Sequence, residues 1–305
     1  GLSLACYLGV FAGNDFFWLF IVMALMSFFW SASLPLVEAI TLGHLREGAS
    51  GYGRIRLWGS IGFIVSVIGL GYLLGYAPVR ALLWIVLGLK LGVLAISRWI
   101  PEPHVALHQN DRFSVLEILR RSEVAAFFSA TFLMAAAHGV YYTFYSIYLV
   151  DHGYSKTAVG WLWAIGVICE VLVFLWMPRL TARFGLRNIL LASFALTVLR
   201  FELIGWGVGS AALIVFAQAL HAASFGSYHA ASVAVTHQFF PGRHQAKGQT
   251  LYTSISFGLG GTIGGLMSGY AWESLSPAWA FGLSGLCALL GMMVLARRLH
   301  LPAQT

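Results

Sequence analysis

Charged residues are scarce in this chain of 305 residues: 10% are Asp, Glu, Lys or Arg, while 59% are hydrophobic. A soluble domain carries about 25% charged residues, so the scarcity of charge excludes an ordinary soluble fold. The mean hydropathy of +0.80 points the same way. We therefore expect an all-α polytopic membrane protein, because helices satisfy their own backbone hydrogen bonds in lipid.

The sequence also has few residues suited to metal, redox or covalent chemistry. Its three cysteines lie inside apolar runs without CxxC spacing, which argues against a disulfide framework and a cysteine-ligated metal. The apolar runs contain no HxxxH or HExxH motif, and no nucleophile and base form a recognisable pair. We expect no enzyme activity, no metal and no cofactor.

Positive charge is spread along the chain rather than gathered in one patch. The formal net charge is +7 and the pI is about 9.5. Because the basic residues lie in short loops, nucleic acid is not an expected partner. Of the 18 lysines and arginines, all but Arg80, Lys90, Lys156 and Arg200 fall on one side of the predicted helices. By the positive-inside rule that side is cytoplasmic, and both ends of this sequence lie on it.

Ten apolar segments are predicted to be membrane helices, with the first one short. They cover residues 1–12, 16–40, 57–75, 79–100, 124–150, 158–177, 188–206, 210–236, 250–272 and 277–299. The long loop 101–123 is expected to be cytoplasmic and to separate the remnant of an N-terminal helical bundle (1–100) from a six-helix C-terminal bundle (124–305). This unequal division, and a start at Gly1 within an apolar run, favour a two-bundle transporter without its first two helices.

One carboxylate, Glu170, lies near the middle of the apolar segment 158–177. An ionisable group at the centre of a spanning helix costs about 2.5 to 3.5 kcal/mol, so such groups usually face the protein interior and mark a proton or substrate path. Arg200 lies at a comparable depth, about 18 Å at 1.5 Å per residue. Pairing would lower the burial cost of both charges, so we expect contact between them and a role in function, with a purely structural ion pair as the alternative.

Two of the predicted helices carry polar stripes at helical spacing. One stripe consists of His138, Tyr141, Tyr145 and Tyr148, and the other of Gln218, His221, Ser224, Tyr228 or His229, and Ser232. Such stripes face a cavity, although tyrosines also pack between helices or at the membrane interface, and polar groups also join helices by hydrogen bonds. His221 is expected to carry a proton, since imidazole titrates near neutral pH.

Other charges in or beside the apolar segments are harder to place from the sequence. Glu38 is close to the basic loop that contains Arg54 and Arg56, so it is either part of a gating salt bridge or a substrate ligand. Glu202 is nearer the outer surface and is expected to reach water. Lys90 should face the bundle interior, but the sequence assigns it no partner.

Three stretches follow a known pattern: GYGRIRLWGSIGFI at 51–64, HGVYYTFYSIYLVDHGYSKTAVGWLWAIGVICEV at 138–171 and PRLTARFGLRNILL at 178–191. They resemble the major facilitator superfamily, specifically its phenylpropionate permease branch of proton symporters. The third is similar to the superfamily's cytoplasmic loop signature, which Arg183, Gly185 and Arg187 match, while Ala182 stands where that signature has Asp. The resemblance implies gating or structural roles for the three matching residues. It does not imply that Ala182 has the gating role of the Asp in the signature.

The resemblance also implies that the ten segments are helices three to twelve of a two-bundle transporter with twelve helices. In the similar lactose-type permeases, an acid, an arginine and a histidine on helices eight, nine and ten handle proton coupling. Glu170, Arg200 and His221 occupy those helices. Members of the phenylpropionate permease branch resemble this chain in having acids at the positions of Glu38 and Glu170. They also have histidines at the positions of His138, His221 and His229.

Together these features predict a proton symporter of a small organic solute, most specifically an aromatic carboxylic acid of the phenylpropionate type. The side chains expected to bind that solute are His138, Tyr141, Tyr142, Tyr145, Arg200, Gln218 and His229. The expected setting is a monomer in the bacterial cytoplasmic membrane. A sugar or nucleoside proton symporter is the alternative, and a transporter-like receptor would need a long extramembrane domain, which is not present between residues 1 and 305.

Overall fold

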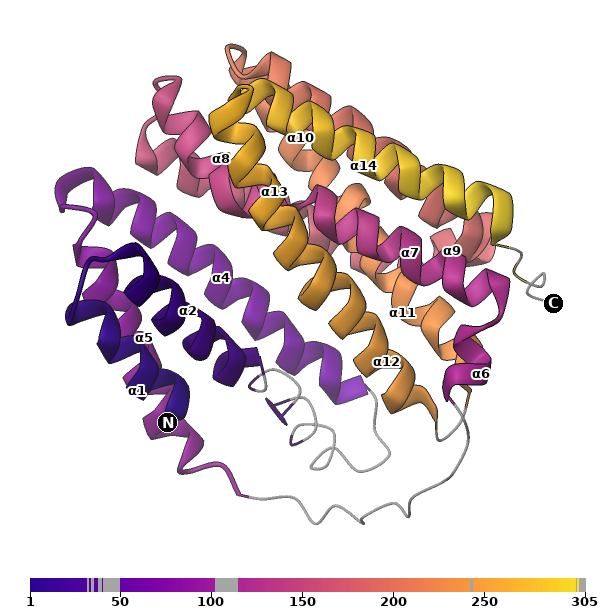
Figure 1. The fold of residues 1–305 in the computed structure, drawn as a ribbon, viewed down its shortest axis with the longest axis horizontal. Coiled ribbons are helices and arrows are strands. Elements are labelled where there is room, and N and C mark those ends of the chain that lie inside the picture. The colour runs from indigo at the N-terminus through magenta and orange to yellow at the C-terminus, as the bar shows by residue number, and fades with distance from the viewer. Residues whose placement is uncertain are drawn as a thin grey trace. The chain divides into compact units, whose positions relative to one another are not determined.

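The computed structural model describes residues 1–31, 33, 36–37, 40, 50–101, 115–241, 244–299 and 301. Within these ranges the chain is a series of helices joined by short turns (Figure 1). The described helical stretches long and apolar enough to cross a membrane are Trp58–Tyr76, Ser122–Asp151, Lys156–Gly207, Ala211–Phe239 and Pro277–Arg298. Shorter apolar helices cover Leu2–Phe11, Phe16–Ser31 and Ala81–Ser97. The expected all-α membrane architecture is confirmed.

Contacts divide the chain into two compact units. The first comprises Gly1–Ile61 and Leu73–Asp111, and the second comprises Gly62–Tyr72 and Arg112–Thr305. The domain bounds expected from the sequence, 1–100 and 124–305, stay a prediction.

In the first unit, a short helix lies between two longer ones. This helix, α1 (Leu2–Leu8), continues into the 3-10 turn η1 (Gly9–Phe11) and is followed by α2 (Phe16–Ser31) and α5 (Ala81–Ser97). The helix α4 (Ser50–Tyr76) contributes residues to both units. The hydroxyl of Tyr7 donates to the Leu83 carbonyl of α5 at 2.8 Å, and that of Ser3 donates to the Met26 carbonyl of α2 at 3.1 Å. These bonds join α1 to both neighbours, as expected where no water competes for polar groups.

Lys90 lies on α5 and turns its ammonium group toward α1 and α2. Its Nζ donates to the hydroxyl of Ser3 at 3.0 Å and lies 4.1 Å from the ring centre of Trp30. A cation over an aromatic face gains electrostatic stabilisation, most of all where water is excluded. The isolated lysine of the sequence thus has both a hydrogen bond and a cation–π contact within its own unit.

The second unit contains the remaining helices, and several of them change geometry along their length. They are α6 (Val115–Leu119), α7 (Ser122–Ala137), α8 (Gly139–Asp151), α9 (Lys156–Gly207), α10 (Ala211–His221), η2 (Ala222–Ser227), α11 (Tyr228–Phe239), α12 (Gln245–Thr253), η4 (Ser254–Gly260), α13 (Gly261–Ser274) and α14 (Pro277–Arg298). Two of these segments, η2 and η4, are π-helical. Their wider turns alter the direction of side chains inside otherwise continuous helices.

Small residues let the helices of this unit cross at short range. A Cβ on Gly139 of α8 would overlap the Gly264 backbone of α13, and a Cβ on Gly264 would overlap the Ala136 backbone of α7. Gly260 of η4 lies directly against the Phe132 backbone of α7. Beside these crossings, the rings of Phe144 and Trp272 stack at 4.5 Å and 12°. Packing of this kind holds helices together where lipid offers no hydrophobic driving force.

The long helix α9 consists of two spans that turn at Gly185, which has φ 73° and ψ 156°. This backbone conformation is essentially restricted to glycine. Just beyond the turn, the guanidinium of Arg187 donates to the Leu299 carbonyl at 2.8 Å and to the Ala296 carbonyl at 2.9 Å. Those carbonyls lie at the end of α14, where helices leave acceptors unsatisfied. The matching positions of the loop motif thus make the turn and cap a neighbouring helix.

Replacing Gly185 by alanine is expected to lower the free energy of unfolding by about 1–3 kcal/mol, because a side chain is strained in that backbone conformation. Thermal unfolding of the purified protein in detergent measures the change. The control is Gly88→Ala in α5, where an added Cβ meets no atom within 4 Å. Equal melting temperatures for both variants would contradict the prediction.

Candidate functional site

Glu170 of α9 lies beside His221 at the end of α10. Its Oε2 is 3.5 Å from Nε2 of His221, and the two side chains are 18% and 6% exposed. The contact is an ion pair when the imidazole is protonated. With a small approach the two groups come within hydrogen-bond reach, which is the geometry required for transfer of a proton between them.

Two glycines bring α9 close to α10 and η2 at this point. A Cβ on Gly226 would lie 2.8 Å from Cγ of Glu170, and a Cβ on Gly166 would lie 3.3 Å from Cδ2 of His221. Both distances are shorter than ordinary carbon contacts, so a side chain at Gly226 would displace Glu170 and one at Gly166 would press on His221. Neither glycine was identified as a site residue from the sequence, because the close approach exists only between packed helices.

Arg200 is completely buried on the second span of α9. Its Nε donates to the Ala217 carbonyl at 3.1 Å, its Nη1 donates to the hydroxyl of Ser224 at 3.4 Å, and its guanidinium carbon lies 4.0 Å from the ring centre of Tyr141. Its Nη2 has no hydrogen-bond partner among the residues that the structure describes. The charge is therefore held by neutral oxygens and an aromatic face, with one donor nitrogen to spare.

The structure brings Glu170, Arg200 and His221 to the same group of helices. Glu170 contacts His221, and Arg200 contacts Ser224, whose hydroxyl in turn donates to the His221 carbonyl at 3.4 Å. Ser224 belongs to the polar stripe noted in the sequence, although it was not among the predicted site residues. Direct pairing of Glu170 with Arg200 stays a prediction.

Tyrosines from α8 cover the same region. The hydroxyl of Tyr141 donates to Oε1 of Gln218 at 3.1 Å, and its ring lies 5.7 Å from that of His221. The ring of Tyr145 lies 4.9 Å from that of Tyr141. The hydroxyl of Tyr145 and Nε2 of Gln218 are buried without a hydrogen-bond partner in the described part of the chain. They offer polar contacts inside an aromatic surround.

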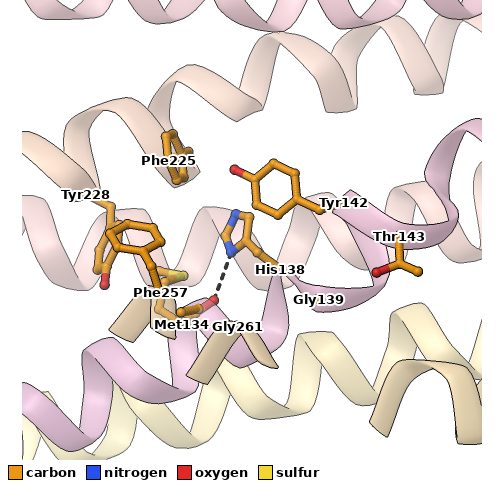
Figure 2. A pocket seen from close by; sticks show the side chains of 10 residues that line it. Met134, His138, Gly139, Tyr142, Thr143, Phe225, Tyr228, Phe257 and Gly261 are labelled. Carbon is orange, nitrogen blue, oxygen red and sulfur yellow. Dashed lines mark hydrogen bonds between the residues drawn. The ribbon is translucent and has the colours of Figure 1, made fainter. Parts of the chain in front are cut away.

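His138 lies at the break between α7 and α8 and is 3% exposed. Its Nδ1 donates to the Met134 carbonyl at 2.9 Å, while its Nε2 has no hydrogen-bond partner among the described residues. It lines a cavity of about 150 Å³ (Figure 2). The other lining residues are Met134, Ala135, Gly139, Tyr142, Thr143, Phe225, Tyr228, Phe257 and Gly261.

Phe225 of η2 lies between the two histidines of its helix. Its ring is parallel to that of His221 at 5.3 Å and to that of His229 at 6.0 Å, each with an interplanar angle of 4°. Nδ1 of His229 is 3.3 Å from the hydroxyl of Tyr252 on α12. Sequence analysis missed Phe225 and Tyr252, although the four-residue spacing of 221, 225 and 229 was a signal for the first.

Some predicted residues lie elsewhere or outside the described part. Tyr148 donates to the Gly205 carbonyl at 2.7 Å and so joins α8 to α9, and Oε1 of Glu202 faces Gly285 of α14. Tyr142 is exposed at the mouth of the cavity. Of the proposed gating residues, Arg183 lies against its neighbour Phe184. Glu38 and the side chains of Arg54 and Arg56 lie outside the described residues.

Comparison with known proteins identifies related sequences and folds. The MFS_1 like family matches residues 2–283. A protein of Escherichia coli (strain K12) named "Probable 3-phenylpropionic acid transporter" is 29% identical over 94% of this chain and 77% of its own length. The "Maltose permease" of Geobacillus stearothermophilus is 25% identical over 96% of this chain and 75% of its own length.

The crystal structure of a mutant of the nucleoside transporter NupG superposes with a TM-score of 0.85. It is 18% identical in sequence, and the match covers 97% of this chain and 80% of that one. At this level of identity the likeness shows the fold alone.

Gly226→Ala is expected to reduce the free energy of unfolding by about 1–3 kcal/mol, because the new methyl group overlaps the Glu170 side chain. The loss should shrink in a Glu170→Ala background, where the overlapping atoms are gone. Thermal unfolding of the two single variants and the double variant measures this coupling. Gly258→Ala, whose Cβ would make an ordinary 3.8 Å contact, is the control. A loss of the same size in both backgrounds would show that Glu170 does not determine the need for glycine.

Proposed function

Because the chain belongs to the MFS_1 like family of major facilitator transporters, we propose that it is a proton-coupled symporter of an aromatic carboxylic acid. The family and the relatives are transporters and not enzymes. The chain is accordingly an integral membrane transporter of a small solute. Proton coupling and the aromatic carboxylic acid as solute are the parts of this function that we propose.

The contact between Glu170 and His221 is the observation that carries the proposal of proton coupling. An acid and an imidazole at 3.5 Å, both largely shielded from solvent, form a pair that can hold one proton in more than one place. Arg200 is linked to this pair through Ser224. In the proposal, binding of an anion at Arg200 is coupled through this link to uptake of the proton.

The environment of Arg200 supports a carboxylate as the charged part of the solute. Among the described residues its acceptors are a backbone carbonyl and a hydroxyl, both neutral, and Nη2 is left over. Guanidinium groups bind carboxylates strongly through paired hydrogen bonds. Tyr141 and Tyr145 give the guanidinium an aromatic surround.

In this proposal the two bundles rock about the site to expose it to each side of the membrane in turn. The protein would act as a monomer in a bacterial cytoplasmic membrane, with both ends of this sequence on the cytoplasmic side. The relative named for 3-phenylpropionic acid transport supports the choice of solute.

The second candidate solute is a sugar or a nucleoside. The unpartnered Nε2 of Gln218 and hydroxyl of Tyr145 suit the many hydroxyl groups of such solutes. The permease named for maltose supports this candidate.

A counterflow panel on the full-length protein in proteoliposomes distinguishes the two. With labelled 3-phenylpropanoate as reporter, external aromatic carboxylates should drive exchange, because they place a carboxylate at Arg200. Maltose and uridine should not. Exchange of labelled maltose or labelled uridine in the same vesicles, with no exchange of labelled 3-phenylpropanoate, would overturn the choice of solute.

Glu170→Gln is expected to abolish uphill accumulation driven by a pH gradient and to leave exchange measurable, because the amide keeps the shape but binds no transferable proton. Uptake with and without an imposed gradient, alongside counterflow, measures both activities. Glu202→Gln is the matched control, since that carboxylate is on the same helix but faces Gly285. Uphill accumulation by Glu170→Gln would remove Glu170 from the proton path.

A further inference from the structure

The cavity beside His138 is built from three helices that are each irregular at the same place. The α7–α8 break is at His138, the π-helical segment η2 contributes Phe225, and the π-helical segment η4 contributes Phe257. Irregular turns inside membrane helices are tolerated where protein packing satisfies them, and π-helical segments recur at functional sites. Their convergence on one cavity indicates a binding site rather than a packing defect.

The size and walls of the cavity suit one aromatic ring. Its volume is about 150 Å³. An engineered apolar cavity of about 150 Å³ in another protein binds benzene. The walls include a thioether from Met134 and the rings of Tyr142, Phe225 and Phe257, all groups that make favourable contacts with an aromatic ring. The glycines 139 and 261 add two stretches of wall without side chains.

His138 contributes a buried nitrogen without a hydrogen-bond partner in the described residues, beside the hydroxyl-bearing Tyr142 and Thr143 of the cavity wall. A carbonyl oxygen only accepts hydrogen bonds, so the proton of the neutral ring lies on Nδ1, which donates to Met134. Burial in an apolar surround favours that neutral form. Nε2 is then an acceptor, and in Figure 2 it points away from Met134, toward the side where Phe225 and Tyr142 lie. A buried acceptor of this kind needs a donor from the occupant.

We propose that this cavity is the ring subsite of the transporter and that Nε2 of His138 selects rings that carry an O–H or N–H donor. The inference rests on the proposed function and narrows its substrate class from aromatic acids to donor-bearing ones, such as a hydroxyphenylpropanoate. The ring N–H of a nucleobase offers the same chemistry. Hydrogen bonding at one edge and ring contacts elsewhere would fix the orientation of the solute.

Equilibrium binding to the purified full-length protein in nanodiscs tests the inference. The probes are 3-phenylpropanoate, its 3-hydroxyphenyl and 4-hydroxyphenyl analogues, the two corresponding methoxy compounds, and uridine. At least one hydroxy isomer should bind about three- to tenfold more tightly than the parent acid, as expected for one additional hydrogen bond. Its methoxy counterpart, which has no donor, should not. Equal affinities for the parent and both hydroxy isomers would overturn the inference.

His138→Asn isolates the acceptor. The asparagine amide can replace Nδ1 as the donor to Met134, but no atom replaces Nε2. The preference for the hydroxy compound over the parent acid should therefore fall to about onefold, whatever the change in affinity for the parent acid itself. His152→Asn is the matched control, because Nδ1 of His152 makes the same type of bond to the Tyr148 carbonyl at 2.8 Å, at the end of α8 and away from the cavity. A preference that persists in His138→Asn would overturn the role of Nε2.

Gly261→Leu tests the location independently. An added Cβ at Gly261 meets no atom within 4 Å, and the residue lines the cavity, so the larger side chain should fill it without displacing a neighbour. Affinity for every ring-containing probe should fall by at least tenfold, with the thermal stability retained. Gly258→Leu, in the same helix but not on the cavity wall, is the control. Unchanged affinities in a folded Gly261→Leu variant would place the ring elsewhere.

The results of these experiments distinguish failure of the ring subsite from failure of the proposed function. If no aromatic acid binds to the wild-type protein, the proposed function fails. If aromatic acids bind without regard to the hydroxyl group, only the ring subsite fails. If uridine alone binds and depends on His138, the subsite is retained and the solute is a nucleoside.

Discussion

The cost of placing charge in hydrocarbon is the constraint on which this structure depends. Three of the membrane-embedded charges described in the structure are held by groups from neighbouring helices. Lys90 uses a hydroxyl and a tryptophan face, Arg200 uses neutral oxygens and a tyrosine face, and Glu170 lies against His221. The fold therefore arranges helices so that these three groups point inward, and a site of interacting charges results.

Close helix contact is the means by which those groups meet. Gly166 and Gly226 allow α9 to approach α10 and η2 at the level of Glu170, while Gly139 and Gly264 bring α8 against α13 behind the cavity. The π-helical turns then place Phe225 and Phe257 on the cavity wall. Small residues and irregular turns, rather than the polar residues themselves, set the geometry of the site.

Phe225 connects the two parts of the proposed mechanism. One face of its ring stacks on His221, the partner of Glu170, and the residue also lines the cavity beside His138. A ring bound in that cavity would contact Phe225 directly. Any shift of Phe225 would change its packing against His221. In the proposed mechanism these packed side chains are the physical route between solute and proton.

The sequence by itself determined the membrane class and the helical architecture, because hydropathy is a local property, and it predicted a comparable depth for Glu170 and Arg200. It also identified His138, His221 and Gln218 through their helical spacing. Only the tertiary structure decided that Glu170 contacts His221, that Lys90 contacts Ser3 and Trp30, and that His138 faces a cavity. Equal depth on separate helices does not determine how each helix is rotated or how far apart two helices lie. Close glycine contacts, a helix break and π-helical turns determine both only when the helices pack.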